Sequence, residues 1–345
     1  MSVFELLGDE YETISFSHDP ASGLRCIIAI YSTALGPALG GTRFWPFESE
    51  DAALRDVLRL SKAMAYKAAA ADLDLGGGKA VVIGDARTQK TPELLRAYGR
   101  AVDRLGGAYI TTADVGTTSA DMDVIAQATR YVTGRSGTSG DPSKVTAFGV
   151  WHGLKAVAEE LWGEPSLTGK HVAVQGIGKV GGGVVRYLAE EGAQLTIADI
   201  DAVAAQTLAS EVGADVARAD EILSVPCDIL SPCALGAVVN DATLSGFKCR
   251  AIAGAANNQL ERPDHGAALT EAGILYAPDY VINAGGLINV EDELHGYDGE
   301  RAHAKTAAIA DRLRNVFERA RTQGTTTAAA ADAIAEERIR ATRKR

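Results

Sequence analysis

Two lysines and an aspartate in the first half of the chain are residue types that can bind a carboxylate and move protons. Lys79 directly follows three glycines and precedes AVVIG, an apolar segment typical of a buried strand. Glycines let a backbone approach a ligand closely. A lysine in this position is therefore poorly explained as a surface residue that only adds solubility. Lys67 lies late in an apolar helical pattern, on the side of Met64, and Asp114 follows another predicted strand. A lysine desolvated beside a second cation can lose its proton near neutral pH, which suits acid–base chemistry.

A purely structural interpretation of these three residues stays open at this level. Lysines after glycine turns are commonly exposed, and an aspartate before Val-Gly is a common turn residue. Residue types and spacing alone do not choose between the two interpretations.

A glycine motif in the second half predicts a dinucleotide site. The predicted strand HVAVQ is followed by GIGKVG, which opens a predicted helix and comprises Gly176, Gly178, Lys179, Val180 and Gly181 with one isoleucine. The first glycine permits a tight turn, the second lets a pyrophosphate approach the backbone, and the third lets helix and strand pack closely. The helix N-terminus attracts the phosphates.

The acidic residue expected after such a motif is also present. Asp199 ends the next predicted strand, LTIAD, at about the 20-residue spacing typical of the motif. An acid there bonds the ribose hydroxyls of NAD and repels the extra phosphate of NADP, and no Arg or Lys follows it through Ala205. The alternative is an ordinary glycine turn with a solvated aspartate, but context, spacing and acid together favour NAD.

The elements that must position these residues follow from the apolar patterns. Strands are predicted at 25–31, 80–84 and 108–114, and helices after Glu48 and from Pro92 to Leu105. Farther on, five short apolar segments, most of them separated by helical patterns, predict a parallel sheet with helices on both faces. They span 171–175, 195–199, 227–232, 250–254 and 274–278.

The length of 345 residues predicts two domains, because one hydrophobic core rarely spans so long a chain. We expect an α/β fold with a substrate domain over 1–137, a Rossmann dinucleotide-binding domain over 138–320, and a cleft between them. The small polar segment Thr138–Lys144 is a candidate hinge. The last helix, about 321–345, is expected to pack back on the first domain.

Composition and sequence patterns argue against several other classes of protein. A net charge of −11 opposes nucleic-acid binding. No apolar run reaches the roughly 18 residues of a membrane span, and the acidic N-terminus lacks the features of a secretory signal. Four scattered cysteines without CxxC, and six histidines without HxxxH or HExxH, favour neither disulfides nor a metal site. A cytoplasmic chain with reduced thiols and no metal is therefore expected.

Longer motifs resemble the glutamate/leucine/phenylalanine/valine dehydrogenase family. They occur in the family's order between about Leu35 and Asn289: LGGTR, MAYK, LGGGK, ADVGTTSADMD, VAVQGIGKVG, GAANNQL and YAPDYVINAGGLINVEDE. The chain length and the segment GLINVEDELHGY look closest to the leucine and valine members. The resemblance implies reversible, NAD-dependent oxidative deamination of an L-amino acid to the 2-oxo acid and ammonia, by a homo-oligomer.

The resemblance also implies roles for individual residues. Lys67 matches the lysine that binds the substrate α-carboxylate, Lys79 the lysine that activates the attacking water, and Asp114 the acid/base at the amino nitrogen. Gly40 and Gly41 match the pair that lines the substrate with its backbone. The remaining matches are Met64 near the substrate, Asn257 near both substrate and nicotinamide, and Thr146, Asn283 and Ala234 near the nicotinamide.

The substrate side chain is expected to be apolar. Leu39 stands where the glutamate dehydrogenases have a lysine, and a buried leucine gives a carboxylate no partner. By resemblance Thr112, Leu287 and Val290 complete the pocket. Valine, leucine and isoleucine are the expected substrates, with phenylalanine second, since a hydrophobic pocket separates single methylenes by only about 1–3 kcal/mol. A catalytically silent NAD-binding regulator and a 2-hydroxy-acid dehydrogenase are the other classes to exclude.

Overall fold

The computed structural model describes residues 10–343, and its contacts divide them into two compact units. The first unit contains residues 10–140, 290–298 and 335–343. The second contains residues 141–289 and 299–334. Among the described residues, no helix has both the length and the apolar character needed to cross a membrane.

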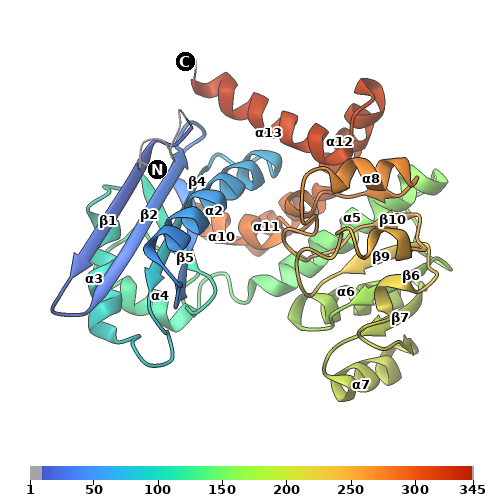
Figure 1. Ribbon diagram of the computed structural model, residues 1–345, viewed down its shortest axis with the longest axis horizontal. Coiled ribbons are helices and arrows are strands. Elements are labelled where there is room, and N and C mark those ends of the chain that lie inside the picture. Colours follow the sequence, from blue (N-terminus) through green and yellow to red (C-terminus); the bar gives the residue numbers. More distant parts are fainter. Residues whose placement is uncertain (1–9, 344–345) are drawn as a thin grey trace. The chain divides into compact units, whose positions relative to one another are not determined.

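The first unit is built on a five-stranded mixed sheet of order β1-β2-β4-β3-β5 (Figure 1). Its elements are β1 (Thr13–Asp19), β2 (Leu24–Ser32), β3 (Ala38–Trp45), α2 (Glu50–Ala70), β4 (Gly76–Ile83), α3 (Pro92–Asp103), β5 (Tyr109–Ala113) and α4 (Ser119–Ile125). Strands β3, β4 and β5 are parallel, whereas β2 pairs antiparallel with both β1 and β4. The carboxyl ends of the three parallel strands therefore meet at one edge, where α/β proteins gather functional groups.

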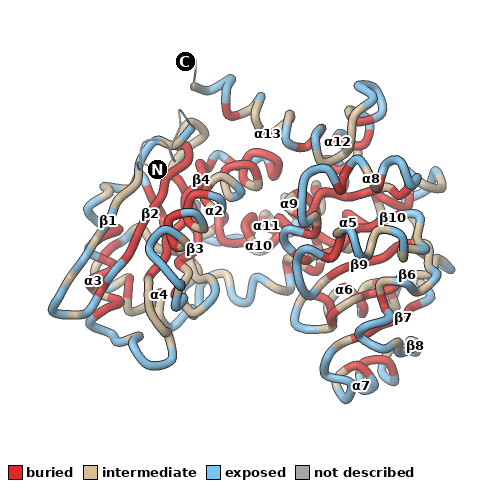
Figure 2. Tube along the Cα trace, in the orientation of Figure 1, coloured by how far each residue is buried: buried red, intermediate tan, exposed pale blue. Residues whose placement is uncertain are grey.

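The period-two alternation of strand side chains divides this sheet into two faces. Ile28, Ala80 and Val82 pack in one cluster with residues of α3 and α4. Ile27, Ala29 and Val81 pack in another cluster with residues of α2. Figure 2 shows how thoroughly β2, β3 and β4 are buried. Lys79 shares the α2 face because it lies two residues before Val81.

Helix α2 approaches the sheet very closely at one point. A Cβ built on Gly77 would lie 2.1 Å from the backbone nitrogen of Ala65. No larger residue fits there, so the glycine run lets the helix backbone rest directly on β4. This contact positions the last turns of α2, including Lys67, against the strand that carries Lys79.

The second unit contains a six-stranded sheet of order β11-β10-β9-β6-β7-β8, in which every pairing is parallel. The strands are β6 (His171–Gln175), β7 (Gln194–Ala198), β8 (Asp215–Val216), β9 (Ile229–Pro232), β10 (Ala251–Ile252) and β11 (Leu275–Tyr276). Figure 1 shows α6 (Lys179–Glu190) and α7 (Ala202–Val212) beside β6 and β7. The parallel sheet expected from the apolar segments is confirmed.

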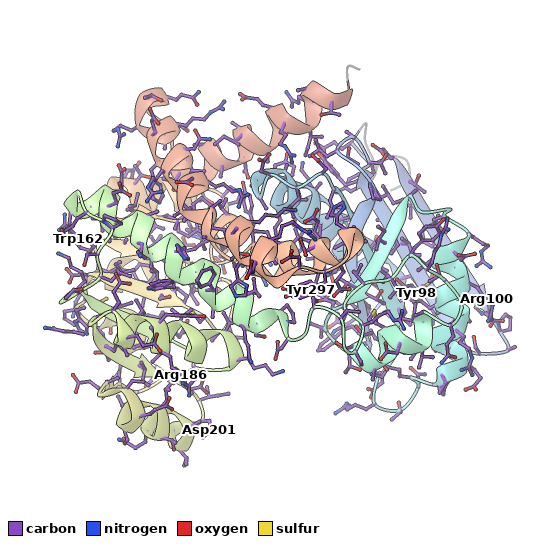
Figure 3. All side chains as sticks on the ribbon, turned by 180° about the vertical axis from the view of Figure 1, so that it is seen from behind. Tyr98, Arg100, Trp162, Arg186, Asp201 and Tyr297 are labelled. Atoms are coloured by element: carbon purple, nitrogen blue, oxygen red, sulfur yellow. The ribbon has the colours of Figure 1, made fainter. Side chains whose placement is uncertain are left out.

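The remaining helices lie mostly in the second unit. They are α5 (Pro142–Trp162), α8 (His265–Glu271), α9 (Asp279–Ile282), α10 (Gly285–Asp292), α11 (Gly299–Ala307), α12 (Ile309–Gln323) and α13 (Thr327–Arg343), with short 3₁₀ turns η1 (Ile222–Ser224), η2 (Leu244–Gly246) and η3 (Glu293–His295). The turn η3 and the ends of α10 and α13 belong to the first unit. Asp141 caps α5 by accepting a hydrogen bond from Ser143 N, and Asp201, labelled in Figure 3, caps α7 in the same way.

Two features of the first unit that bear on the candidate site differ from the sequence-based expectation. Strand β4 begins at Gly76, so Lys79 lies inside the strand rather than before it. Strand β3 was not predicted, because its glycines resemble a turn in the sequence. Both differences have one cause: strand pairing with β2, β4 and β5 supplies backbone hydrogen bonds that outweigh the weak strand propensity of glycine.

Candidate active site

Lys79 and Asp114 form the centre of the candidate site. Lys79 lies in β4, Asp114 directly follows β5, and Nζ of Lys79 is 2.6 Å from Oδ2 of Asp114. Thr117 fixes the turn after β5 because its Oγ1 accepts from Asp114 N and donates to Thr42 O. The Lys79 residue is only 6% exposed. The sequence-based choice of these two residues therefore leads to one close, largely desolvated ion pair.

The glycine pair of β3 lies between the two charged residues. Strand β3 pairs with β4 on one side and β5 on the other, and Gly41 is opposite Thr112. A Cβ on Gly41 would lie 2.7 Å from Cβ of Asp114, and one on Gly40 would lie 1.7 Å from Gly78 O. Both positions must be glycine for the three strands to bring Lys79 and Asp114 together.

Burial and neighbouring charges change the proton affinity of both groups. Burial lowers the pKa of Lys79, the facing Asp114 raises it, and Arg43 lowers it, with a pKa below the ordinary lysine value as the result. Burial acts to raise the pKa of Asp114, but Lys79 and Arg43 outweigh it, so the pKa lies below the ordinary aspartate value. At rest Asp114 is a carboxylate, and Lys79 releases its proton more readily than an exposed lysine.

Lys67 lies on α2, in the last turn of the helix, and is partly buried. Met64, one turn earlier, is also partly buried. Helix α2 packs on β4, the strand next to the glycine pair, and on β2 beyond it. The sequence-based assignment of a carboxylate-binding cation at Lys67 remains a proposal.

The residues expected to surround the substrate side chain have different degrees of burial. Leu39 precedes the glycine pair, faces the α2 side of the sheet and is 1% exposed. Thr112 on β5 is partly buried and faces the same side as Asp114, two residues later. Val290 in the first unit and Leu287 in the second are both buried. That these four residues together surround the substrate side chain remains a proposal.

A buried group of hydroxyls beneath β3 was missed by the sequence-based reasoning. Tyr109 donates a hydrogen bond to Gly40 O at 2.7 Å. Thr42 lies 2.5 Å from Tyr98 Oη and 2.6 Å from Thr111 Oγ1, and Tyr98, labelled in Figure 3, comes from α3. These bonds hold the glycine pair from the face opposite Lys79. The YxT alternation of Tyr109 and Thr111 in β5 is the one sequence signal for them.

The dinucleotide motif lies where it was expected, between β6 and α6. Gly176 has a φ of +86°, and a Cβ there would lie 2.6 Å from Cβ of Ala234. A Cβ on Gly181 would lie 1.9 Å from Gly176 O, whereas one on Gly178 would meet nothing within 4 Å. The first and third glycines are therefore required by the protein itself. Gly178 borders open space at the start of α6, as the approach of a pyrophosphate requires.

Lys179 and Val180 form the first turn of α6. Lys179 Nζ donates to Asp141 Oδ2 at 2.9 Å, and Val180 is partly buried. Lys179 is thus paired with the carboxylate that caps α5. Its predicted contact with the cofactor remains a proposal.

Asp199 follows β7 and accepts two backbone hydrogen bonds. Its Oδ2 accepts from Ile177 N in the glycine turn at 2.8 Å, and its Oδ1 accepts from Asp201 N at 2.9 Å. It also lines a hollow of about 410 Å³ together with Ile200, whose side chain is almost fully exposed. This is the arrangement needed to receive an adenosine beside the glycine turn.

The same hollow contains a cation that the sequence did not indicate. Arg218 lines it, although it comes from the segment after β8, well beyond Ala205. Its guanidinium pairs with Asp220 at 2.8 Å. The lack of Arg and Lys between Asp199 and Ala205 is therefore not sufficient to favour NAD over NADP.

Asn283, expected near the nicotinamide, carries an unsatisfied amide in the second unit. Asn283 is 4% exposed, and its Nδ2 donates to Ala255 O and to Asn257 Oδ1. Its buried Oδ1 makes no hydrogen bond. Asn257 and Ala234 are exposed, and Thr146 Oγ1 donates to Pro142 O. An orphaned amide oxygen and an open glycine turn fit a dinucleotide, because a bound carboxamide could donate to Asn283.

One group of possible metal ligands exists among the described residues. Asp241, Glu261 and His265 have ligand atoms within 4.8 Å of one another. Arg262, however, binds Asp241 through two nitrogens at 2.9 and 3.0 Å. The positive charge required by Asp241 is therefore supplied by an arginine, and the group is explained as an ion-pair cluster.

A parallel dinucleotide-type sheet, together with a buried lysine–aspartate pair beside a glycine strand, defines an oxidoreductase of the amino-acid dehydrogenase class. Comparison with known families agrees. The family described as Glu/Leu/Phe/Val dehydrogenase, dimerisation domain, matches residues 12–131, and Glutamate/Leucine/Phenylalanine/Valine dehydrogenase matches residues 137–208 and 196–344. The chain belongs to the glutamate/leucine/phenylalanine/valine dehydrogenase family, which implies a nicotinamide cofactor.

Individual relatives are similar along nearly the whole chain. Leucine dehydrogenase of Thermoactinomyces intermedius is 51% identical, covering 100% of this chain and 95% of the relative. Valine dehydrogenase of Streptomyces coelicolor is 49% identical, with coverages of 97% and 94%. The crystal structure of L-tryptophan dehydrogenase from Nostoc punctiforme superposes with a TM-score of 0.89 at 45% identity and covers 99% of each chain.

Proposed function

We propose that this enzyme catalyses the reversible, NAD-dependent oxidative deamination of branched-chain L-amino acids, with leucine and valine as the best substrates. The observation that carries the reaction is the Lys79–Asp114 pair, 2.6 Å apart and beside the glycine pair of β3. Support for the aliphatic substrate comes from buried Leu39 and from leucine and valine dehydrogenases at about 50% identity.

Each charged residue has a distinct task in the proposed mechanism. Lys67 binds the substrate carboxylate, and Asp114 begins as a base that accepts a proton from the substrate ammonium. The nicotinamide supplies the hydride acceptor for the substrate Cα–H. Lys79 takes a proton from the water that adds to the resulting iminium carbon. Asp114 then returns its proton to the nitrogen and, as a carboxylate again, accepts the proton of the new hydroxyl, so that the C–N bond breaks to give the 2-oxo acid and ammonia.

The depressed pKa values suit these tasks. An aspartate that is ionised at rest can accept the first proton, and a lysine that gives up its proton easily can serve as the base toward water. The activity in the deamination direction should therefore increase with pH as Lys79 loses its proton.

The side-chain specificity rests on Leu39. A substrate carboxylate placed against this residue would meet no cation, and an unpaired buried charge is costly. Thr112, Val290 and Leu287 are proposed to surround the remainder of the side chain. Glutamate should therefore react poorly, while branched aliphatic side chains should react well.

An aromatic amino acid is the second candidate substrate. The observation that favours it is the TM-score of 0.89 to a tryptophan dehydrogenase at 45% identity, which is not far below the identity to the leucine enzymes. Phenylalanine is the simplest test of this alternative, because it adds an aromatic ring without a polar atom.

Two further proposals concern the cofactor and the assembly. Asp199, which borders the hollow beside the glycine turn, favours NAD over NADP because it would bond the ribose hydroxyls and repel a 2′-phosphate. A homo-oligomer is proposed because residues 12–131 match a family domain described as a dimerisation domain.

The test is NADH formation with NAD and a panel of L-leucine, L-valine, L-isoleucine, L-phenylalanine and L-glutamate. Fast turnover of the branched-chain substrates with almost none for glutamate is expected. A preference for phenylalanine would keep the reaction and overturn the aliphatic assignment. Absence of turnover with every amino acid, while NADH still binds, would support a silent regulator instead. The same panel with NADP in place of NAD tests the cofactor.

A further inference from the structure

Arg43 ends the LGGTR motif and has no role in the mechanism described so far. It lies on β3 two residues after Gly41, so its side chain points to the α2 face of the sheet, as Lys79 does. Its Nη1 donates to Asp56 Oδ2 at 2.7 Å, and its Nε lies 3.4 Å from Asp114 Oδ2. Arg43 is 23% exposed and Asp56 16%.

Four charged side chains thus alternate in sign along one line of contacts. Lys79 is 2.6 Å from Asp114, Asp114 is 3.4 Å from Arg43, and Arg43 is 2.7 Å from Asp56. Lys79 and Arg43 both approach the same oxygen of Asp114, Oδ2. The Nε of Arg43 is buried and makes no hydrogen bond, so charge rather than hydrogen bonding couples it to Asp114.

We propose that Arg43, held in place by Asp56, is a positioning residue that shares the Asp114 carboxylate with Lys79 and so leaves Lys79 with an incomplete counter-ion. Lys79 is thereby kept ready to act as an amine. This inference rests on the proposed function, because it assumes that Lys79 is the base toward water.

Arg43 and Asp56 shift the pKa of Lys79 in opposite directions. Burial lowers the pKa of Lys79 and Asp114 raises it; Arg43 lowers it further, and Asp56 raises it. Removing the charge of Arg43 should therefore raise the pKa of Lys79, and removing that of Asp56 should lower it. The charged groups that act on Lys79 come from β3, α2 and the end of β5, while its partner on β2 is the uncharged Ala29.

A simpler role for Arg43 would be to attach α2 to β3. Both roles predict some loss of stability when Arg43 is replaced. Only the electrostatic role predicts that the proton affinity of Lys79 changes, with opposite signs at Arg43 and Asp56. A titration of Lys79 therefore separates them.

The experiment compares Arg43→Gln, Arg43→Lys and Asp56→Asn with the control Arg59→Gln. Arg59 binds the other oxygen of Asp56, Oδ1, at 2.9 Å, but it is 56% exposed. Two readouts are taken against pH in the full-length enzyme. One is kcat/KM for L-leucine with NAD, and the other is the acylation rate of Lys79 by acetic anhydride, followed by peptide mass spectrometry.

The pH midpoints of kcat/KM and of acylation should move in opposite directions in the Arg43 and Asp56 variants. For Arg43→Gln both midpoints should move to higher pH by on the order of one unit, and for Asp56→Asn they should move to lower pH. Arg43→Lys keeps the charge and should recover most of the shift, and Arg59→Gln should leave the midpoints unchanged. Unchanged midpoints in Arg43→Gln and Asp56→Asn, or shifts of the same sign, would overturn the inference.

Acylation of Lys79 can be measured without turnover. It therefore tests the role of Arg43 separately from the proposed function. If the enzyme deaminates no amino acid, the proposed function fails, yet the acylation midpoints still decide the role of Arg43. If Arg43→Gln does not fold, Asp56→Asn decides it: a shift to lower pH supports the inference, and an unchanged midpoint contradicts it.

Discussion

Replacing Lys79 by methionine should separate catalysis from stability. The ammonium is almost fully buried, and transferring such a charge from water costs several kcal/mol. Its attraction to Asp114 over 2.6 Å is worth about 6 kcal/mol at an effective dielectric constant of about 20. These two contributions nearly cancel. Methionine is unbranched and apolar, and Asp114 retains Arg43 at 3.4 Å. We therefore expect the free energy of unfolding to change by no more than about 2 kcal/mol.

The effect on the rate should be much larger. A positioned acid–base group contributes roughly 10²- to 10⁴-fold, equivalent to about 3–5 kcal/mol of the activation free energy. The assay follows NADH absorbance with L-leucine, alongside urea unfolding and NADH binding by fluorescence. Lys62→Met is the control, since Lys62 also pairs with an acid, Glu10, but is more exposed. A rate within tenfold of the parent enzyme would refute the assignment of Lys79. Parallel loss of stability, cofactor binding and activity would indicate a structural role instead.

Three further changes test other parts of the structure. Asp199→Ala should weaken NADH binding at least about tenfold in a fluorescence titration, because the ribose loses its acceptor; unchanged affinity would contradict the assignment. Asp141→Ala should lower the stability to urea by about 1 kcal/mol through loss of the α5 cap. The hydrogen bond from Ser143 N lowers the pKa of Asp141 to about 2, so this contribution should be full above the ordinary value of 3.8 and disappear as pH falls through about 2; equal urea midpoints at neutral pH would contradict it. Gly40→Ala should give no soluble, folded chain, because its Cβ would meet Gly78 O at 1.7 Å; a folded variant with the parent circular dichroism spectrum would show that β3 and β4 can separate.

The second unit was the more predictable part of the fold. Five of its six strands are short apolar segments separated by turns and helices, and a parallel sheet is the arrangement that buries them on both faces. The sixth strand, β8, is exposed and was not predicted. The glycine turn was equally predictable, since each glycine has a separate steric reason that is visible in local sequence. Arg218 was not predictable, because it reaches the hollow beside Asp199 through the packing of β8 on β7.

The sequence by itself determined which residues could do chemistry: Lys67, Lys79 and Asp114 are unusual in type and context, and the glycine motif with Asp199 is specific. Tertiary structure alone decided that Lys79 and Asp114 are 2.6 Å apart and that Arg43 is the second cation on the same carboxylate. These contacts join β3, β4 and the end of β5, which are far apart along the chain. Strand register and the close approach that glycines permit set them, and neither is encoded within any single segment.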